Sequence, residues 1–184
     1  MNTANVSRQT LIDTLRRTTT RHPDKLAIKQ HDQCWTYQDF YQRCTAVAGG
    51  LSRLGIEPGD RVAILSRNSS TFALARYAVA AMGGVLVPVN FMLNANEAAY
   101  ILNHCEARLL LVGKDELGNA QQLSALCPAI EHMVWMGREE GLATPEKMTP
   151  FADLLSGQAL VATDSLAAAL PAQIIDTRGT ESAP

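Results

Sequence analysis

Apolar residues follow the 3.6-residue period of an amphipathic helix in the segment after Thr36. The side chains on this expected face are Phe40, Cys44, Val47, Ala48 and Leu51. Such a stripe predicts a helix with one buried side. Thr36 and Asp39 have the spacing of a capping box, with aspartate in place of the usual glutamate or glutamine. Gly55 is suited to the left-handed position at the end of this helix.

From residue 61 onward, short apolar runs alternate with helical patterns. The expected strands are Arg61–Ser66, Val85–Asn90, Ala107–Gly113 and His132–Gly137, and the expected helices are Ser69–Met82, Asn94–Cys105 and Asp115–Leu126. Strand–helix alternation predicts crossover units and a parallel sheet, and unbroken apolar strands indicate that both sheet faces are covered. The predicted fold class is therefore α/β, a mostly parallel sheet with helices on both faces. Pro88 inside its run favours an edge strand or the end of a strand at that point.

A helix and a hairpin are expected before this unit. The helix is Thr10–Thr20, and the hairpin strands are Lys25–Gln30 and Gln33–Tyr37, around the turn His31-Asp32. We divide the chain into an N-terminal α/β subdomain at 1–137, a surface-running connection at 138–172 with a short helix at Phe151–Leu155, and a segment at 173–184 that begins with a strand at Gln173–Asp176.

Composition narrows the functional classes. The 184 residues are 47% hydrophobic and 18% charged, with a net charge of −2 and no basic block, so nucleic acid is a poor candidate partner. No apolar run approaches the roughly 18–20 residues of a membrane helix, and the first residues lack a secretory signal. We therefore expect a cytoplasmic protein in which the four cysteines, none of which forms a C-x-x-C pair, are reduced.

Candidate chemistry within the α/β unit is limited. The turn after the first parallel strand, Ser66–Ser70, contains no glycine, whereas a dinucleotide fold places G-x-G-x-x-G there. Arg67 and the serines are candidates for a phosphate contact, but a helix cap by Asn68 or Ser69 is the favoured interpretation. The acidic residues, Glu116 among them, fall mostly at turns and helix starts, where capping and solvation explain them. No catalytic triad or metal-ligand spacing is evident, and we predict no catalytic or metal-binding residue.

The last residues carry a different signal. Gly179 allows close backbone approach, and Thr177, Thr180 and Ser182 offer hydroxyl groups after an apolar run. A Walker loop does not fit, because G-x-x-x-x-G-K-[ST] is absent.

This end resembles the start of the phosphate-binding loop of the adenylate-forming family, which includes acyl-CoA synthetases, firefly-type luciferases and peptide-synthetase adenylation domains. That loop reads roughly aromatic-T-S-G-[ST]-T-G-x-P-K-G, and Thr177, Gly179, Thr180 and Pro184 stand at matching positions. The chain departs from the pattern at Asp176, Arg178, Glu181 and Ser182. The body also resembles family motifs, in the right order, at Asp24–Ile28 (DKLAI), Trp35–Phe40 (WTYQDF), Leu54–Ala63 (LGIEPGDRVA), Ala81–Asn90 (AMGGVLVPVN) and Asn96–Leu102 (NEAAYIL).

The resemblance implies the N-terminal subdomain of a medium- or long-chain fatty acid–CoA ligase, truncated inside its nucleotide loop. Such ligases use ATP and Mg²⁺ to convert a fatty or aryl acid to an acyl-adenylate, and CoA then displaces AMP. By the same resemblance, Thr177, Gly179 and Thr180 would hold the leaving pyrophosphate. We expect this chain alone to be inactive and to bind none of these ligands strongly, because the acid, adenine, ribose and metal contacts of family members lie beyond Pro184. Asp176 and Glu181 act in the same direction, since they add negative charge where polyphosphate would lie.

Two alternatives stay open. The chain could be a stand-alone, non-catalytic interaction module that forms a homodimer through an exposed apolar face. It could also be a generic nucleotide-binding domain, although the first crossover turn without glycine argues against this. The sequence does not indicate the acyl substrate, the oligomeric state or the origin of the truncation.

Overall fold

The computed structural model describes residues 10–137 and 143–156. The strands are β1 (Leu26–Gln30), β2 (Gln33–Thr36), β3 (Arg61–Leu65), β4 (Val85–Val89), β5 (Leu109–Val112), β6 (His132–Trp135) and β7 (Thr149–Pro150). The helices are α1 (Leu11–Arg21), α2 (Tyr37–Arg53), α3 (Ser70–Met82), α4 (Ala95–His104), the 3-10 helix η2 (Lys114–Glu116), α5 (Leu117–Leu126) and α6 (Phe151–Leu155).

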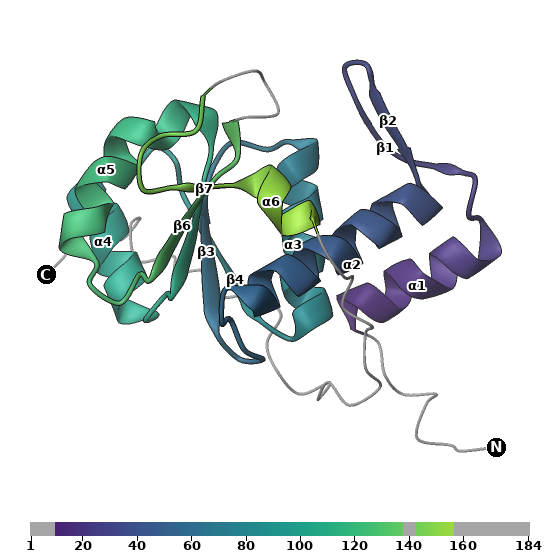
Figure 1. The fold of residues 1–184 in the computed structure, drawn as a ribbon, viewed down its shortest axis with the longest axis horizontal. Helices are drawn as coiled ribbons and strands as arrows, with labels where there is room; N and C mark the ends of the chain where they lie inside the picture. Colours follow the sequence, from purple (N-terminus) through teal and green to yellow (C-terminus); the bar gives the residue numbers. More distant parts are fainter. Residues whose placement is uncertain (1–9, 138–142, 157–184) are drawn as a thin grey trace, which may run out of the picture.

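The main sheet within these residues has the order β4-β3-β5-β6-β7, and every pair in it is parallel. Figure 1 shows the sheet edge-on between its helices. The register places Val62 opposite Leu86 on one side and opposite Leu109 on the other. Among the described strands β4 lies at the edge of the sheet, which is one of the two positions that Pro88 predicts, because proline has no backbone N–H to donate to a further strand.

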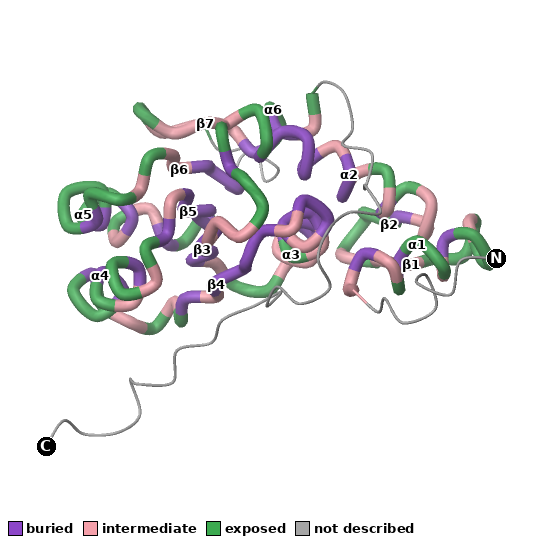
Figure 2. Tube along the Cα trace, turned by 90° about the horizontal axis from the view of Figure 1, so that it is seen from below, coloured by how far each residue is buried: buried purple, intermediate pink, exposed green. Residues whose placement is uncertain are grey.

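Helices cover both faces of the sheet, which confirms the predicted α/β class. On β3, Val62 and Ile64 join the core formed with α1, α2, α3 and α6. Ala63 and Leu65, which alternate with them, join the core formed with α4 and α5. All four side chains are fully buried, and the strands are buried between the two helical layers in Figure 2. Because both faces of each central strand are covered, their sequences are apolar throughout rather than alternating.

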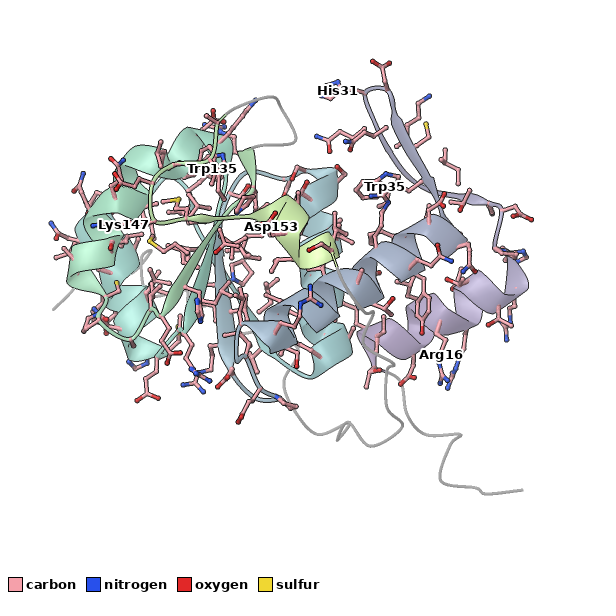
Figure 3. The ribbon with its side chains drawn as sticks, viewed as in Figure 1. Arg16, His31, Trp35, Trp135, Lys147 and Asp153 are labelled. Carbon is pink, nitrogen blue, oxygen red and sulfur yellow. The ribbon has the colours of Figure 1, made fainter. Side chains whose placement is uncertain are left out.

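The N-terminal hairpin lies beside the helical layer that contains α2 and α3. β1 and β2 pair antiparallel, and Gln30 lies opposite Gln33 next to the turn. In Figure 3, Trp35 points from β2 towards the helices, and His31 lies at the tip of the hairpin. The Trp35 ring stacks on Phe40 of α2 at a centroid distance of 6.3 Å. The predicted hairpin is therefore confirmed, and an aromatic contact fixes it to the core.

The sequence prediction was wrong about part of the segment after residue 137. We expected a surface-running connection, but Thr149 and Pro150 pair with β6 as the strand β7. Phe151 and Leu154 of the short helix α6 are 1% and 2% exposed and belong to the core beside α2. A helix of five residues is too short for a helical period to show which side chains are buried, so the contact with α2 decides it.

One predicted helix also begins differently. The expected helix Asp115–Leu126 is a 3-10 turn at η2 followed by α5 from Leu117. The expected strand Gln173–Asp176 lies outside the described residues. The division of the chain into the three segments 1–137, 138–172 and 173–184 stays a prediction.

Candidate functional site

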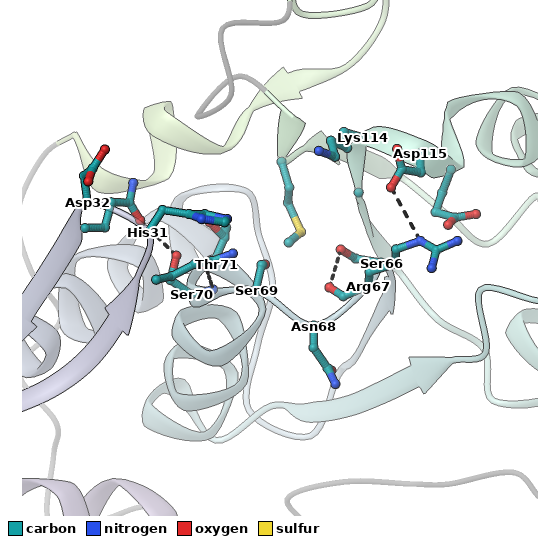
Figure 4. A pocket seen from close by; sticks show the side chains of 15 residues that line it. His31, Asp32, Ser66, Arg67, Asn68, Ser69, Ser70, Thr71, Lys114 and Asp115 are labelled. Carbon is teal, nitrogen blue, oxygen red and sulfur yellow. Dashed lines mark hydrogen bonds and ion pairs between the residues drawn. The ribbon is translucent and has the colours of Figure 1, made fainter.

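A pocket of about 530 Å³ opens at the carboxyl ends of the parallel strands. Its walls are the turn after β3 (residues 66–71), the turn after β5 (residues 113–116), Met136 after β6, and the tip of the N-terminal hairpin (residues 30–33). Figure 4 shows polar side chains from these segments around the opening. The volume falls within the range of small-molecule sites, about 300–1,000 Å³.

Chain topology explains why a pocket forms there. After β3 the chain passes through α3 to β4 on one side of β3, while β5 lies on the other side. α3 packs on one face of the sheet and α5 on the opposite face. The turns after β3 and β5 therefore leave the sheet in opposite directions and open a crevice between them. In open α/β sheets this switch point is the general place for ligands.

The turn after β3 caps a helix, as the sequence favoured. Ser69 Oγ accepts a hydrogen bond from the backbone N–H of Phe72 at 3.0 Å, and Ser69 is the N-cap of α3. Of the two predicted cap residues, the structure therefore selects Ser69 rather than Asn68. The predicted helix cap is confirmed.

Arg67 has protein partners on both sides. Its guanidinium lies 4.4 Å from the centre of the Phe91 ring, and its Nε lies 3.5 Å from the Asp115 carboxylate. The ion pair joins the two turns across the pocket wall (Figure 4). Both partners are about half exposed, so the pair adds little to stability. A phosphate contact by Arg67 stays a prediction.

Two glutamines connect the hairpin to the first crossover turn, and sequence reasoning missed them. Gln30 Oε1 accepts from the backbone N–H of Ser70, and Gln33 Oε1 accepts from Ser70 Oγ at 3.0 Å. Both glutamines line the pocket. The only signal in the sequence is their symmetric placement beside the hairpin turn. Their hydrogen bonds hold the tip of the hairpin against the start of α3 at the pocket wall.

Close backbone contact holds the two turns together. A Cβ atom on Gly113 would lie 2.5 Å from Ser66 Oγ and 3.0 Å from Ser66 Cα. Any side chain at residue 113 would therefore push the turns apart, and glycine is required by space rather than by backbone conformation.

Glu116 corrects a second expectation. Glu116 is only 6% exposed, whereas we expected the acidic residues at helix starts to be solvated. Burial raises the pKa of its carboxyl, the Arg67 charge opposes this shift, and Asp115 adds to it. The pocket wall thus contains a buried acid beside a cation. The pocket is suited to a polar ligand, because its lining offers hydrogen-bond donors, hydroxyl groups and charges of both signs. No nucleophile–base pair is evident among the described residues that line it.

The predicted loop residues Thr177, Gly179 and Thr180 lie outside the described part of the chain, so their role stays a prediction. Within residues 10–137 and 143–156, no group of three or more His, Cys, Asp or Glu side chains could hold a metal ion. No helix in this same part is long and apolar enough to cross a membrane.

Comparisons with known proteins by family profile, by sequence and by structure all point to AMP-binding enzymes and CoA ligases. The profile of the AMP-binding enzymes matches residues 15–184. A long-chain-fatty-acid–CoA ligase of Thermus thermophilus is 36% identical over 124 residues, which are 67% of this chain and 22% of that protein. A 4-hydroxybutyrate–CoA ligase of Metallosphaera sedula is 36% identical over 96 residues, 52% of this chain and 18% of that protein.

A solved structure from Rhodopseudomonas palustris, of a candidate long-chain-fatty-acid CoA ligase, superposes with a TM-score of 0.79 at 31% identity. The superposition covers 87% of this chain and 39% of that one. The chain thus spans about a fifth of the curated relatives and two fifths of this solved structure.

Proposed function

This chain belongs to the family of AMP-binding enzymes, and from that premise we propose that it is part of an ATP-dependent acyl-CoA ligase. The family match over residues 15–184 carries the proposal. The pocket at the switch point supports it, because this sheet edge is where α/β folds bind ligands. In this proposal the described residues form one wall of the substrate-binding side of the ligase.

The proposed reaction has two steps. A carboxylate attacks the α-phosphorus of ATP, which gives an acyl-adenylate and pyrophosphate, and the sulfur of CoA then displaces AMP. Thr177, Gly179 and Thr180 are proposed to bind the leaving pyrophosphate through backbone N–H groups and hydroxyls, which stabilise negative charge as it develops. Mg²⁺ would screen the phosphate charges, but no metal ligand is proposed among the described residues. The acid is a fatty or aryl carboxylic acid in this proposal.

We expect the 184-residue chain by itself to form no acyl-adenylate. The Thermus thermophilus relative is more than four times longer than the part that matches, and a complete adenylation site needs contacts to acid, adenine and metal as well as to phosphate. The measurement is pyrophosphate release with ATP, Mg²⁺ and a panel of fatty and aryl acids. The Thermus thermophilus ligase serves as the positive control, and turnover above the blank would contradict the expectation.

The source gene provides the independent test of the ligase assignment. In-frame codons for Lys-Gly and several hundred further residues after Pro184 would support a piece of a ligase. A stop codon there in the native transcript would overturn the ligase proposal for this protein.

One observation favours the alternative of an association module. Tyr100 on α4 and Leu126 on α5 are exposed apolar side chains in the same helical layer. Sedimentation at high concentration distinguishes the two cases, because a module that associates through this face gives dimers and a monomer counts against it. Micromolar ATP binding by the chain would instead favour a generic nucleotide-binding domain. The cytoplasmic location stays a prediction.

A further inference from the structure

The helices α4 and α5 each end at a cysteine. Cys105 is the C-cap residue of α4, and Cys127 is the C-cap residue of α5. The two helices pack on the same face of the sheet (Figure 1). Their ends are joined by a hydrogen bond from Asn103 Nδ2 to the Leu126 carbonyl oxygen at 3.0 Å. The hydrogen bond thus joins a residue two positions before Cys105 to the residue just before Cys127.

Both sulfur atoms lie against the same stretch of α4. Cys127 Sγ lies 4.0 Å from the carbonyl oxygen of Ala99, so it reaches across from α5 to α4. Cys105 Sγ lies 3.5 Å from the carbonyl oxygen of Leu102. Ala99 and Leu102 are three residues apart, which is about 4.5 Å along a helix axis. Cys127 therefore faces α4 across the seam between the helices, and Cys105 packs against the same apolar core.

The environments of the two thiols differ. Cys127 is 1% exposed, whereas Cys105 is only partly buried. Burial raises the pKa of the Cys127 thiol, and the neighbouring Cys105 adds to that shift. Cys105 is therefore the thiol that a dissolved oxidant reaches first, and Cys127 is positioned as the second thiol to react.

We propose that Cys105 and Cys127 form an oxidisable thiol pair, which a peroxide converts into a disulfide between the ends of α4 and α5. The Cys105 thiolate attacks one peroxide oxygen, breaks the O–O bond and becomes a sulfenic acid, with water as the other product. The Cys127 sulfur then attacks the Cys105 sulfur and expels its hydroxyl as a second water. In total two thiols and one hydrogen peroxide give one disulfide and two waters.

The disulfide would close a loop that contains β5 and α5. Cys105 lies just before β5 and Cys127 just before β6, so the crosslink would lie near the amino ends of these strands. The pocket lies at their carboxyl ends. The expected consequence is a more stable helical layer, because a crosslink restricts the unfolded chain. The proposal does not depend on the acyl-CoA ligase assignment.

The test uses the 184-residue chain with Cys34→Ser, because Cys34 is exposed and would otherwise form disulfides between chains. The protein is treated with a small excess of hydrogen peroxide and quenched with catalase. Peptide mapping without reduction should then show one crosslinked peptide pair that contains Cys105 and Cys127. Titratable thiols in denaturant should fall from three to one, with Cys44 still reduced as the internal control. The oxidised protein should melt at a higher temperature than the reduced protein.

A second variant tests whether the oxidation of Cys127 requires the Cys105 thiol. In Cys105→Ser, in the same background, peroxide should leave Cys127 reduced and the melting temperature unchanged. The proposal is overturned if Cys105 reaches the sulfinic acid while Cys127 stays reduced, or if Cys105 crosslinks only between chains. Mapping of the Cys34→Ser protein decides this even if the Cys105→Ser variant does not fold.

Discussion

Gly50 shows how one residue without a side chain determines a contact between helices. It lies inside α2, where glycine weakens a helix relative to alanine. A Cβ atom at this position would lie 2.5 Å from the Cα and the carbonyl oxygen of Leu154 on α6. Arg53, one turn later, donates to the carbonyl oxygens of Leu154 and Ser156. The glycine therefore allows the backbones of α2 and α6 to touch.

We expect Gly50→Ala to destabilise the protein by about 1–3 kcal/mol, the usual cost of overpacking. The added methyl group must displace backbone atoms of α6, which cannot move aside as a flexible side chain can. The free energy of unfolding in urea measures this change.

Gly118→Ala is the matched control for this substitution. Gly118 lies in α5 and is exposed, and a Cβ atom added to it would have no neighbouring atom within 4 Å. The control should be neutral or stabilising by up to about 1 kcal/mol, because alanine has the higher helix propensity. If Gly50→Ala were as neutral or stabilising as the control, the close contact between α2 and α6 would not be the reason for glycine at this position.

Helix starts are the elements that local sequence determines best. The capping box predicted at Thr36 is present: Thr36 Oγ1 accepts from the Asp39 N–H at 3.1 Å, and the Asp39 carboxylate accepts from the Thr36 N–H at 3.0 Å. Hydrogen bonds from Thr36 hold the pKa of the Asp39 carboxyl below its usual value. A second capping box joins Asn94 and Glu97 at the start of α4. In both cases donor and acceptor are three residues apart, so no distant residue is needed.

We expect Thr36→Ala to lower the free energy of unfolding by about 1 kcal/mol, within the range of about 0.5–2 for N-cap residues. The variant loses the hydroxyl that satisfies the Asp39 N–H, and the start of α2 then frays. Thr36→Ser keeps this hydroxyl and should stay close to the parent protein in the same urea titration. If serine destabilised as much as alanine, the threonine methyl group and not the cap would be the cause.

At the scale of the whole molecule, the sheet separates two cores, and each contains a buried thiol. Cys44 lies in the core with α2 and α3, and Cys127 lies in the core with α4 and α5. Burial raises the pKa of both thiols. In the unfolded chain, cysteine loses its proton near about pH 8.5. Above that pH the unfolded state binds fewer protons than the folded state, so the folded state loses relative stability.

We therefore expect stability to be constant with respect to these thiols below about pH 8 and to fall as the pH rises beyond about 8.5. Each buried thiol contributes a slope of about 1.4 kcal/mol per pH unit until its folded pKa is reached. Urea titrations from about pH 7 to 10 measure this slope. Cys44→Ala should be less stable at every pH, yet show a shallower alkaline slope. An unchanged slope would mean that the Cys44 thiol titrates alike in both states.

Sequence reasoning was most successful where the signal is local or periodic. The caps at Thr36 and Ser69, the apolar strands and the edge position of β4 among the described strands all follow from neighbouring residues. It failed at Phe151 and Leu154, whose burial depends on the contact of α6 with α2, about a hundred positions earlier in the chain. It failed also at Glu116, because a carboxylate at the start of a helix has the same local sequence whether solvent reaches it or not.

The sequence by itself determined the α/β class, the boundaries of most elements and, through its motifs, the family of AMP-binding enzymes. These follow from backbone hydrogen bonding and from the period of apolar side chains, which are properties of adjacent residues. Only the tertiary structure decided which distant segments meet. The pocket is formed by residues 30–33, 66–71 and 113–116. The hydrogen bond from Asn103 to Leu126 brings together the ends of α4 and α5, where Cys105 and Cys127 lie. Such meetings depend on strand order and crossover direction, because these fix which distant segments share one edge of the sheet.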